Sequence, residues 1–190
     1  KALSDFTRKL EISTILGAPV IIVASESPTE IKPEDYDRAV VNIRQAADIA
    51  SEYGVKIALE FIKGSTLVGS LSTAANIVAK ADHANLGILF DTFHYHAGIS
   101  KPDDIVQIPE GTLFFVHVND CLGIPRERLS DAHRTYLGEG VLPVHDLVAR
   151  LKATGYTGWY SFESFNRDIW KEDPFQVAKR IRKDMERMLS

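Results

Sequence analysis

Four side chains of the kinds that bind metal ions occur at the ends of four apolar segments. Carboxylates end the segments 56–60, 87–91 and 159–163, and an imidazole lies near the end of 114–118: Glu60, Asp91, Glu163 and His117. Three converging carboxylates would repel one another unless a cation neutralised them. We therefore expect these four residues to hold one divalent ion. Their oxygen-rich set favours Mn²⁺, Mg²⁺ or Co²⁺, and Zn²⁺ also accepts such ligands.

Each of these residues also has an ordinary explanation when it is taken alone. A charged residue directly after an apolar run often does no more than end a strand. His117 alone would also fit a buried histidine whose hydrogen bonds are satisfied. The metal hypothesis gains its weight from repetition, because four successive strand-like segments each carry such a residue at the same end.

Strand-like and helix-like segments alternate along the chain. Continuous apolar runs, rich in β-branched and aromatic residues, predict strands at 20–23, 56–61, 87–90, 114–118 and 159–162. Amphipathic stretches predict helices over 3–10, 36–49 and 143–154. Capping residues predict two more, a short helix capped by Ser72 and a final helix that begins at Pro174 and runs towards 189. The segment 102–108 is predicted to be a short helix or a helical turn. This alternation implies a parallel sheet with helices outside it.

A Rossmann sheet and a (β/α)₈ barrel both satisfy the alternation. No Gly-x-Gly-x-x-Gly follows a predicted strand, and Gly138-Glu139-Gly140 lies in a loop, so we expect no dinucleotide site. In a barrel the carboxyl ends of all strands meet at one mouth, which would gather the four candidate ligands. A complete barrel takes about 250 residues. The sequence therefore predicts an α/β chain forming one domain over 1–190, an incomplete TIM barrel of about five βα units.

Composition argues against several classes of partner. The chain has 190 residues, 45% of them hydrophobic, which suits a single core. Its formal net charge of -4 and the lack of a basic stripe argue against nucleic acid. No apolar run is long enough to span a membrane. The single cysteine, Cys121, excludes an internal disulfide, so nothing demands an oxidising compartment and we expect a cytoplasmic protein. The chain opens with Lys1 and not with Met, so the sequence does not decide whether a targeting segment precedes it.

Several motifs resemble the xylose-isomerase-like TIM-barrel superfamily, and most of all its inosose (2-keto-myo-inositol) isomerases. They are Ala58-Leu59-Glu60-Phe61, the Asp-Thr-Phe-His-x-His run at 91–96, His117-Val118-Asn119-Asp120, Pro125, Asp131, Arg134, Gly138-Glu139-Gly140 and Phe162-Glu163-Ser164-Phe165. The resemblance covers nearly all of 15–190 and implies an eight-stranded barrel that this chain enters in the helix before the fourth strand. The open edge near Ile21 would then be covered by a homo-oligomer or another association.

The resemblance also implies an activity, namely metal-dependent isomerisation or epimerisation of a ketose or inosose-like keto-polyol in inositol or carbohydrate metabolism. A proton would move between neighbouring carbons through an enediolate that the metal stabilises. By resemblance, Glu60 and Glu163 carry the proton while also binding the metal, and Asp91 and His117 only bind it. His94 and Arg134 would bind substrate. The alternative for His94 is a histidine in a surface loop, and the alternative for Arg134 is a salt bridge within the loop that follows His117.

Three other functions share these sequence features. A dehydratase of the inosose or dehydroshikimate type would use the same proton abstraction and then expel a hydroxyl group. A truncated, non-catalytic remnant would bind metal without turnover. An endonuclease IV-like enzyme would need several metals, with Asp131 and His133 as extra ligands, and a basic surface that the net charge does not suggest.

Overall fold

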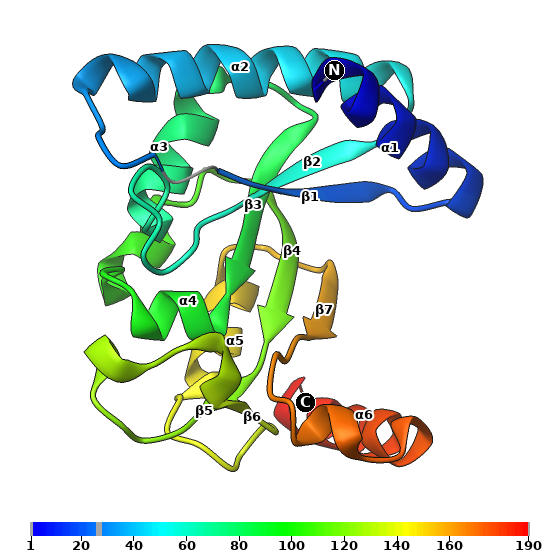
Figure 1. Ribbon diagram of the computed structural model, residues 1–190, viewed down its shortest axis with the longest axis vertical. Coiled ribbons are helices and arrows are strands. Elements are labelled where there is room, and N and C mark those ends of the chain that lie inside the picture. The colour runs from blue at the N-terminus through cyan, green and yellow to red at the C-terminus, as the bar shows by residue number, and fades with distance from the viewer. Residues whose placement is uncertain (1, 26–27, 190) are drawn as a thin grey trace.

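The computed structural model describes residues 2–25 and 28–189. Its main feature is a five-stranded parallel sheet in the order β1-β2-β3-β4-β7. The strands are β1 (Val20–Ala24), β2 (Lys56–Glu60), β3 (Leu86–Asp91), β4 (Leu113–Val118) and β7 (Trp159–Phe162). Two short strands, β5 (Asp120–Cys121) and β6 (Arg134–Thr135), pair antiparallel. The main sheet curls like part of a barrel and does not close within the described residues (Figure 1).

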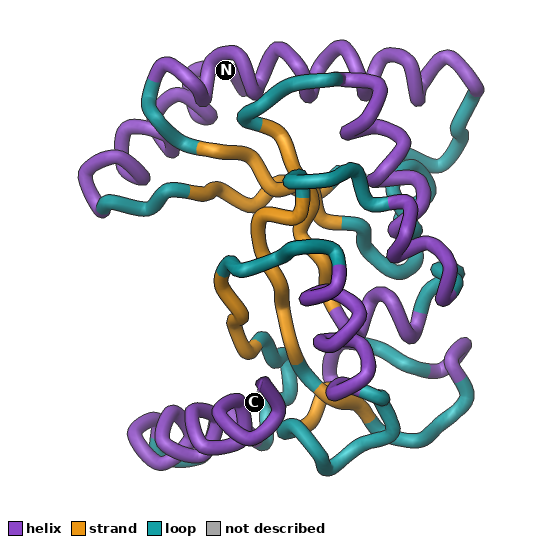
Figure 2. The backbone as a smooth tube through the Cα atoms, turned by 180° about the vertical axis from the view of Figure 1, so that it is seen from behind, coloured by secondary structure: helices purple, strands orange, loops and turns teal. Residues whose placement is uncertain are grey.

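Helices lie outside the curled sheet, as Figures 1 and 2 show from opposite sides. The α-helices are α1 (Ala2–Leu16), α2 (Pro33–Glu52), α3 (Leu71–Ala81), α4 (Thr92–Ala97), α5 (Val144–Ala153) and α6 (Pro174–Leu189). Four 3₁₀ helices complete the described part: Pro102–Gln107, Arg126–Arg128, Asp131–His133 and Ile169–Lys171. Among the helices that the structure describes, none has both the length and the apolar character needed to cross a membrane.

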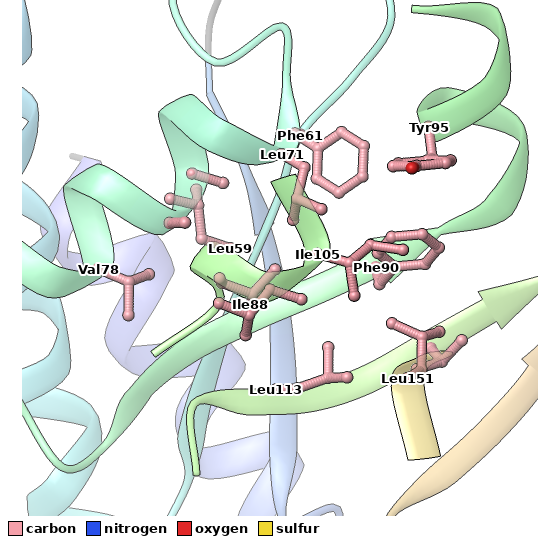
Figure 3. Close-up of a cluster of buried hydrophobic side chains, with 14 of the residues drawn as sticks. Leu59, Phe61, Leu71, Val78, Ile88, Phe90, Tyr95, Ile105, Leu113 and Leu151 are labelled. Atoms are coloured by element: carbon pink, nitrogen blue, oxygen red, sulfur yellow. The ribbon is translucent and has the colours of Figure 1, made fainter. Parts of the chain in front are cut away.

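The outer face of the sheet packs against these helices and forms the core. Figure 3 shows part of it, where Leu59, Ile88 and Phe90 of the sheet gather with Leu71 and Val78 of α3. These five side chains are at most 4% exposed. Each such buried side chain contributes about 1.5–3 kcal/mol to folding. The core thus holds β2 and β3 rigidly, and it fixes where their carboxyl ends lie.

The inner face of the sheet carries the polar strand ends. The parallel register places Glu60 beside Leu89, and it places Asp91 beside His117. His117 in turn lies beside Ser161 of β7. Register partners in a sheet point to the same side, and so do residues two apart along one strand. The polar ends of β2, β3 and β4 therefore share one face at one end of the sheet.

The five predicted strands are confirmed, each within one residue of its expected ends, and so is the parallel sheet that the alternation predicted; its curl is that of the expected incomplete TIM barrel and not of a Rossmann sheet. The cap of α3 was assigned to the wrong serine. Ser70 caps the helix, because its Oγ accepts a hydrogen bond from the backbone N of Thr73 (3.3 Å), and Ser72 lies inside the first turn. Helix α4 and the β5–β6 pair were not predicted.

Candidate metal centre

Four strand ends bring together the side chains that the sequence singled out. Glu60, Asp91 and His117 come from β2, β3 and β4, and Glu163 directly follows β7. Glu163 extends the strand pairing, since its backbone N donates to the carbonyl oxygen of Val118 (3.4 Å). One potential ligand atom from each of the four side chains lies within 4.8 Å of the other three. Within 2–25 and 28–189, this is the one group of three or more His, Cys, Asp or Glu with such spacing.

The imidazole of His117 faces all three carboxylates. Its Nδ1 lies 3.4 Å from Oε1 of Glu60, 3.6 Å from Oδ2 of Asp91 and 3.3 Å from Oε2 of Glu163. Nδ1 of His117 and Oε1 of Glu60 are nevertheless buried without a hydrogen-bond partner. Atoms that bind one tetrahedral ion at about 2.1 Å lie about 3.4 Å from one another. The spacing and the unpaired atoms therefore fit a shared cation better than hydrogen bonding among the four residues.

The electrostatics of the group are those of a cation site. Burial alone would lower the pKa of His117, but Asp91, Glu163 and Glu60 outweigh burial and raise it to about 11. Burial alone would raise the pKa of Asp91, yet His117 and Arg134 hold it well below its usual range. In the absence of a metal, a proton on His117 thus supplies the positive charge that the three carboxylates attract.

Arg134 contributes to the charge of the group. Its side chain is fully buried, and its Nη1 donates to Oδ2 of Asp91 (2.8 Å) and lies 3.3 Å from Oε2 of Glu163. With a neutral His117, the three carboxylates and this guanidinium carry two negative charges between them, and Asp131, which also pairs with Arg134, adds a third. A divalent cation would offset most of this excess, so the residues present fit the predicted ion in the sign of their charge as well as in spacing.

The two residues predicted to bind substrate lie beside this group. His94, in α4, is 5% exposed, so the surface-loop alternative is wrong. Its Nδ1 accepts a hydrogen bond from the backbone N of Lys63 (3.3 Å), and its Nε2 lies 3.2 Å from Nη2 of Arg134. Arg134 does make the salt bridge with Asp131 that its loop suggested, and it contacts Asp91 as well. Their roles towards substrate stay predictions.

The suggested second metal site is not formed. Nδ1 of His133 accepts a hydrogen bond from the backbone N of Ser130 (3.0 Å), and Oδ1 of Asp131 accepts from Arg134. Neither side chain belongs to a metal-binding group among the residues that the structure describes.

Sequence reasoning missed the residues that surround Arg134. The guanidinium carbon lies 4.5 Å from the ring centre of Phe93 and 5.7 Å from that of Phe165. The carbonyl oxygen of Arg134 accepts a hydrogen bond from Nδ2 of Asn166 (3.0 Å). Phe93 and Phe165 lie close to Asp91 and Glu163 in the sequence, but no spacing rule indicates that both rings flank one arginine.

Comparison with known proteins agrees with the barrel architecture and with the family that the motifs resemble. Residues 1–190 match the family model of the xylose isomerase-like TIM barrel. The inosose isomerase of Halalkalibacterium halodurans is 29% identical over 184 residues, which are 94% of this chain and 64% of that protein. The 3-dehydroshikimate dehydratase of Pseudomonas putida is 29% identical over 87% of this chain and 26% of its own length.

A solved structure agrees with the sequence relatives. The crystal structure of the IOLI protein with a bound zinc atom superimposes with a TM-score of 0.93 at 26% identity, covering 99% of this chain and 69% of that one. The chain spans less than two thirds of the length of the Halalkalibacterium inosose isomerase. The activity of the whole protein is therefore a matter for proposal.

Proposed function

The chain belongs to the xylose isomerase-like TIM barrel family, and on that premise we propose that it is a metal-dependent isomerase or epimerase of an inosose-like keto-polyol or a ketose. The observation that carries the proposal is the convergence of three carboxylates and one imidazole at the carboxyl end of the curled sheet. The likeness to inosose isomerase and to a zinc-bound structure supports both the substrate class and the metal. The proposed partner is thus a small molecule.

In this proposal Glu60, Asp91, His117 and Glu163 hold one divalent ion. Zinc is supported by the zinc atom bound in the IOLI protein, and Mn²⁺, Mg²⁺ and Co²⁺ suit the same oxygen-rich set. When bound, the ion stabilises the negative charge that develops on the carbonyl and hydroxyl oxygens of the substrate as a C–H bond breaks.

Two glutamates carry the proton in the proposed reaction. Glu60 and Glu163 come from β2 and from the end of β7, with β3 and β4 between them in the sheet, so they approach the centre from opposite sides. One glutamate, as a carboxylate, takes the proton from the carbon that bears the hydroxyl group beside the ketone. In isomerisation the other glutamate, carrying a proton taken from solvent, gives that proton to the former carbonyl carbon, while the hydroxyl proton passes to the former carbonyl oxygen; in epimerisation it gives the proton to the opposite face of the same carbon. The proton left on the first glutamate then returns to solvent. Glu163 is the more accessible of the two, with 28% of its side chain exposed against 11% for Glu60.

His94 and Arg134 orient the substrate. Because Nδ1 of His94 accepts from the backbone of Lys63, the neutral ring carries its proton on Nε2. That N–H and Nη2 of Arg134 are donors whose nitrogens lie only 3.2 Å apart. A hydroxyl or carbonyl oxygen of the substrate, accepting from both, relieves the contact between these two donors and fixes the carbon chain relative to the glutamates.

Hydrogen exchange tests the proposal directly. The protein, loaded with Zn²⁺ or Mn²⁺ and analysed for bound metal, is incubated in D₂O with a panel of inososes and ketoses and followed by NMR. We expect deuterium to appear at the carbon beside the ketone and the exchange to stop when a chelator removes the metal. A metal-loaded protein that exchanges no member of the panel would contradict the proposal.

A dehydratase is the second candidate, supported by the likeness to the Pseudomonas dehydratase. The same carboxylates would then remove a proton, and the neighbouring carbon would lose its hydroxyl group as water. Mass spectrometry of the product separates the two, since isomerisation conserves the mass and dehydration lowers it by one water.

A further inference from the structure

We propose that Asp131 is a positioning residue of the metal centre, which aligns Arg134 so that this arginine directs one oxygen each of Asp91 and Glu163 towards the ion. The inference rests on the proposed metal-binding function and adds a residue outside the four ligands. Asp131 contacts none of the four; its Oδ1 bonds to Arg134 and also lies 4.0 Å from Nε2 of His94, and the hydrogen-bonded path to the ligands runs through Arg134.

Asp131 holds one edge of the guanidinium. Its Oδ1 accepts hydrogen bonds from Nε (3.0 Å) and Nη2 (2.8 Å) of Arg134. The guanidinium is planar and rigid, so fixing this edge also fixes the direction of Nη1. Nη1 is the atom that donates to Oδ2 of Asp91 and lies 3.3 Å from Oε2 of Glu163. By fixing the orientation of the guanidinium, Asp131 therefore also fixes where Nη1 contacts Asp91 and Glu163, two of the candidate ligands.

The surroundings of Arg134 leave it little freedom to move in any other way. Phe93 and Phe165 flank the guanidinium. Its backbone pairs with Cys121 in the β5–β6 ladder and accepts a hydrogen bond from Asn166. The arginine side chain is fully buried, whereas 44% of the Asp131 side chain is exposed. Asp131 is therefore the most exposed charged partner of Arg134, and unlike Asp91 and Glu163 it is not a candidate ligand.

The oxygens that Arg134 selects are those that face His117. Oδ2 of Asp91 and Oε2 of Glu163 lie 3.6 and 3.3 Å from its Nδ1. The other oxygen of Asp91, Oδ1, caps helix α4 by accepting a hydrogen bond from the backbone N of His94 (2.8 Å), so Oδ2 is the oxygen that faces the site. Losing Asp131 would loosen Nη1 and leave the charge of Arg134 less neutralised beside the ion. Both effects weaken metal binding.

Metal affinity of the metal-free protein tests this role without relying on activity. Zn²⁺ alone is titrated against a chromogenic chelator with the wild-type chain, D131A and the control D168A. Alanine removes the carboxylate together with its hydrogen bonds to Arg134, and Asp168 is the control because it also forms an i,i+3 ion pair, but with the exposed Lys171. We expect D131A to lower the affinity by about 10- to 100-fold, as outer partners of metal ligands do, and D168A to leave it unchanged.

A double-mutant cycle separates positioning from a general effect of charge. R134K keeps the positive charge and loses the planar fork, so adding D131A to R134K should change the affinity by no more than about threefold. Thermal unfolding of each metal-free variant shows whether it is folded. Equal affinities for D131A and wild type would overturn the positioning role while leaving the proposed function standing. A wild-type chain that binds no Zn²⁺ would overturn both.

Discussion

Glu163 is the candidate ligand whose replacement should separate chemistry from folding. Of the four side chains it is the most exposed, and its backbone continues β7, so a change of its charge disturbs little packing. We expect Glu163→Gln to retain the fold and to lower deuterium exchange by at least about 10²-fold, because an amide cannot carry the proton. The measurement is NMR exchange in D₂O at saturating metal, with Glu110→Gln on an exposed loop as the control. Retained turnover would remove Glu163 from its proposed role.

We expect the proposed metal binding to depend on pH through His117. In the metal-free protein its pKa is raised to about 11, so the ring is protonated at neutral pH and an incoming ion must displace that proton. Metal affinity should therefore rise with pH, by about tenfold per unit between pH 6 and 9. Calorimetry in two buffers of different ionisation enthalpy should show about one proton released per ion. An affinity that does not change over this range would contradict protonation of His117.

The candidate ligands could be predicted from the sequence, but the importance of Arg134 could not. Each ligand ends an apolar run, and the ends of parallel strands meet at one edge, so sequence order is enough to gather them. The partners of Arg134 come from three separate segments, with Asp91 and Phe93 in one, Asp131 in another and Phe165 in a third. Only the folded chain shows that they enclose one guanidinium.

At the scale of elements, Asp120 of β5 holds the loop between β6 and α5. Its two carboxylate oxygens accept from the backbone N of Gly138 (3.1 Å), Gly140 (3.0 Å) and Leu142 (2.8 Å), as well as from Cys121 (2.9 Å). This loop follows the strand that carries Arg134, so the contacts of Asp120 also support the metal centre.

Asp120→Asn should destabilise the fold. The amide group of asparagine keeps one acceptor oxygen but turns two hydrogens towards backbone N–H groups in a fully buried site. We expect the free energy of unfolding to fall by about 2–4 kcal/mol. Urea denaturation measures the change, with Asp37→Asn on the exposed face of α2 as a control that should shift stability by less than about 0.5 kcal/mol. A variant of Asp120 as stable as wild type would show that these hydrogen bonds do not hold the loop.

The strands were predictable because each is a short apolar run bounded by turn residues, whereas α4 showed no pattern that predicts a helix. Five of its six residues are buried, so it shows no polar face and no helical period. Its cap is Asp91, a residue already interpreted as a metal ligand. The cap of α3 was misplaced because Ser70 and Ser72 are equally good caps in sequence, and only the hydrogen bond to Thr73 separates them.

At the scale of the whole molecule, the sheet does not close, and its two edge strands, β1 and β7, each pair on one side only within the described residues (Figure 1). Ile22 of β1 is 43% exposed and Trp159 of β7 is 68% exposed. An exposed strand edge next to exposed apolar side chains favours pairing with another chain. We therefore propose that the 190-residue chain associates with itself or with a further segment of a barrel.

Sedimentation equilibrium tests this association. We expect a mass above the 21.1 kDa of one chain, increasing with concentration. Ile22→Lys should weaken the association by placing a charge on the edge strand β1, whereas Val41→Lys, at an exposed position of α2, should not. A single species of one-chain mass at every concentration would contradict the prediction.

The central claim is that one cation joins four strand ends, and anomalous X-ray scattering from crystals grown with Zn²⁺ or Mn²⁺ tests it most directly. We predict one strong peak about 2.0–2.2 Å from Nδ1 of His117 and from one oxygen each of Glu60, Asp91 and Glu163. A metal peak elsewhere, or well-ordered side chains at this position with no peak at saturating metal, would contradict it.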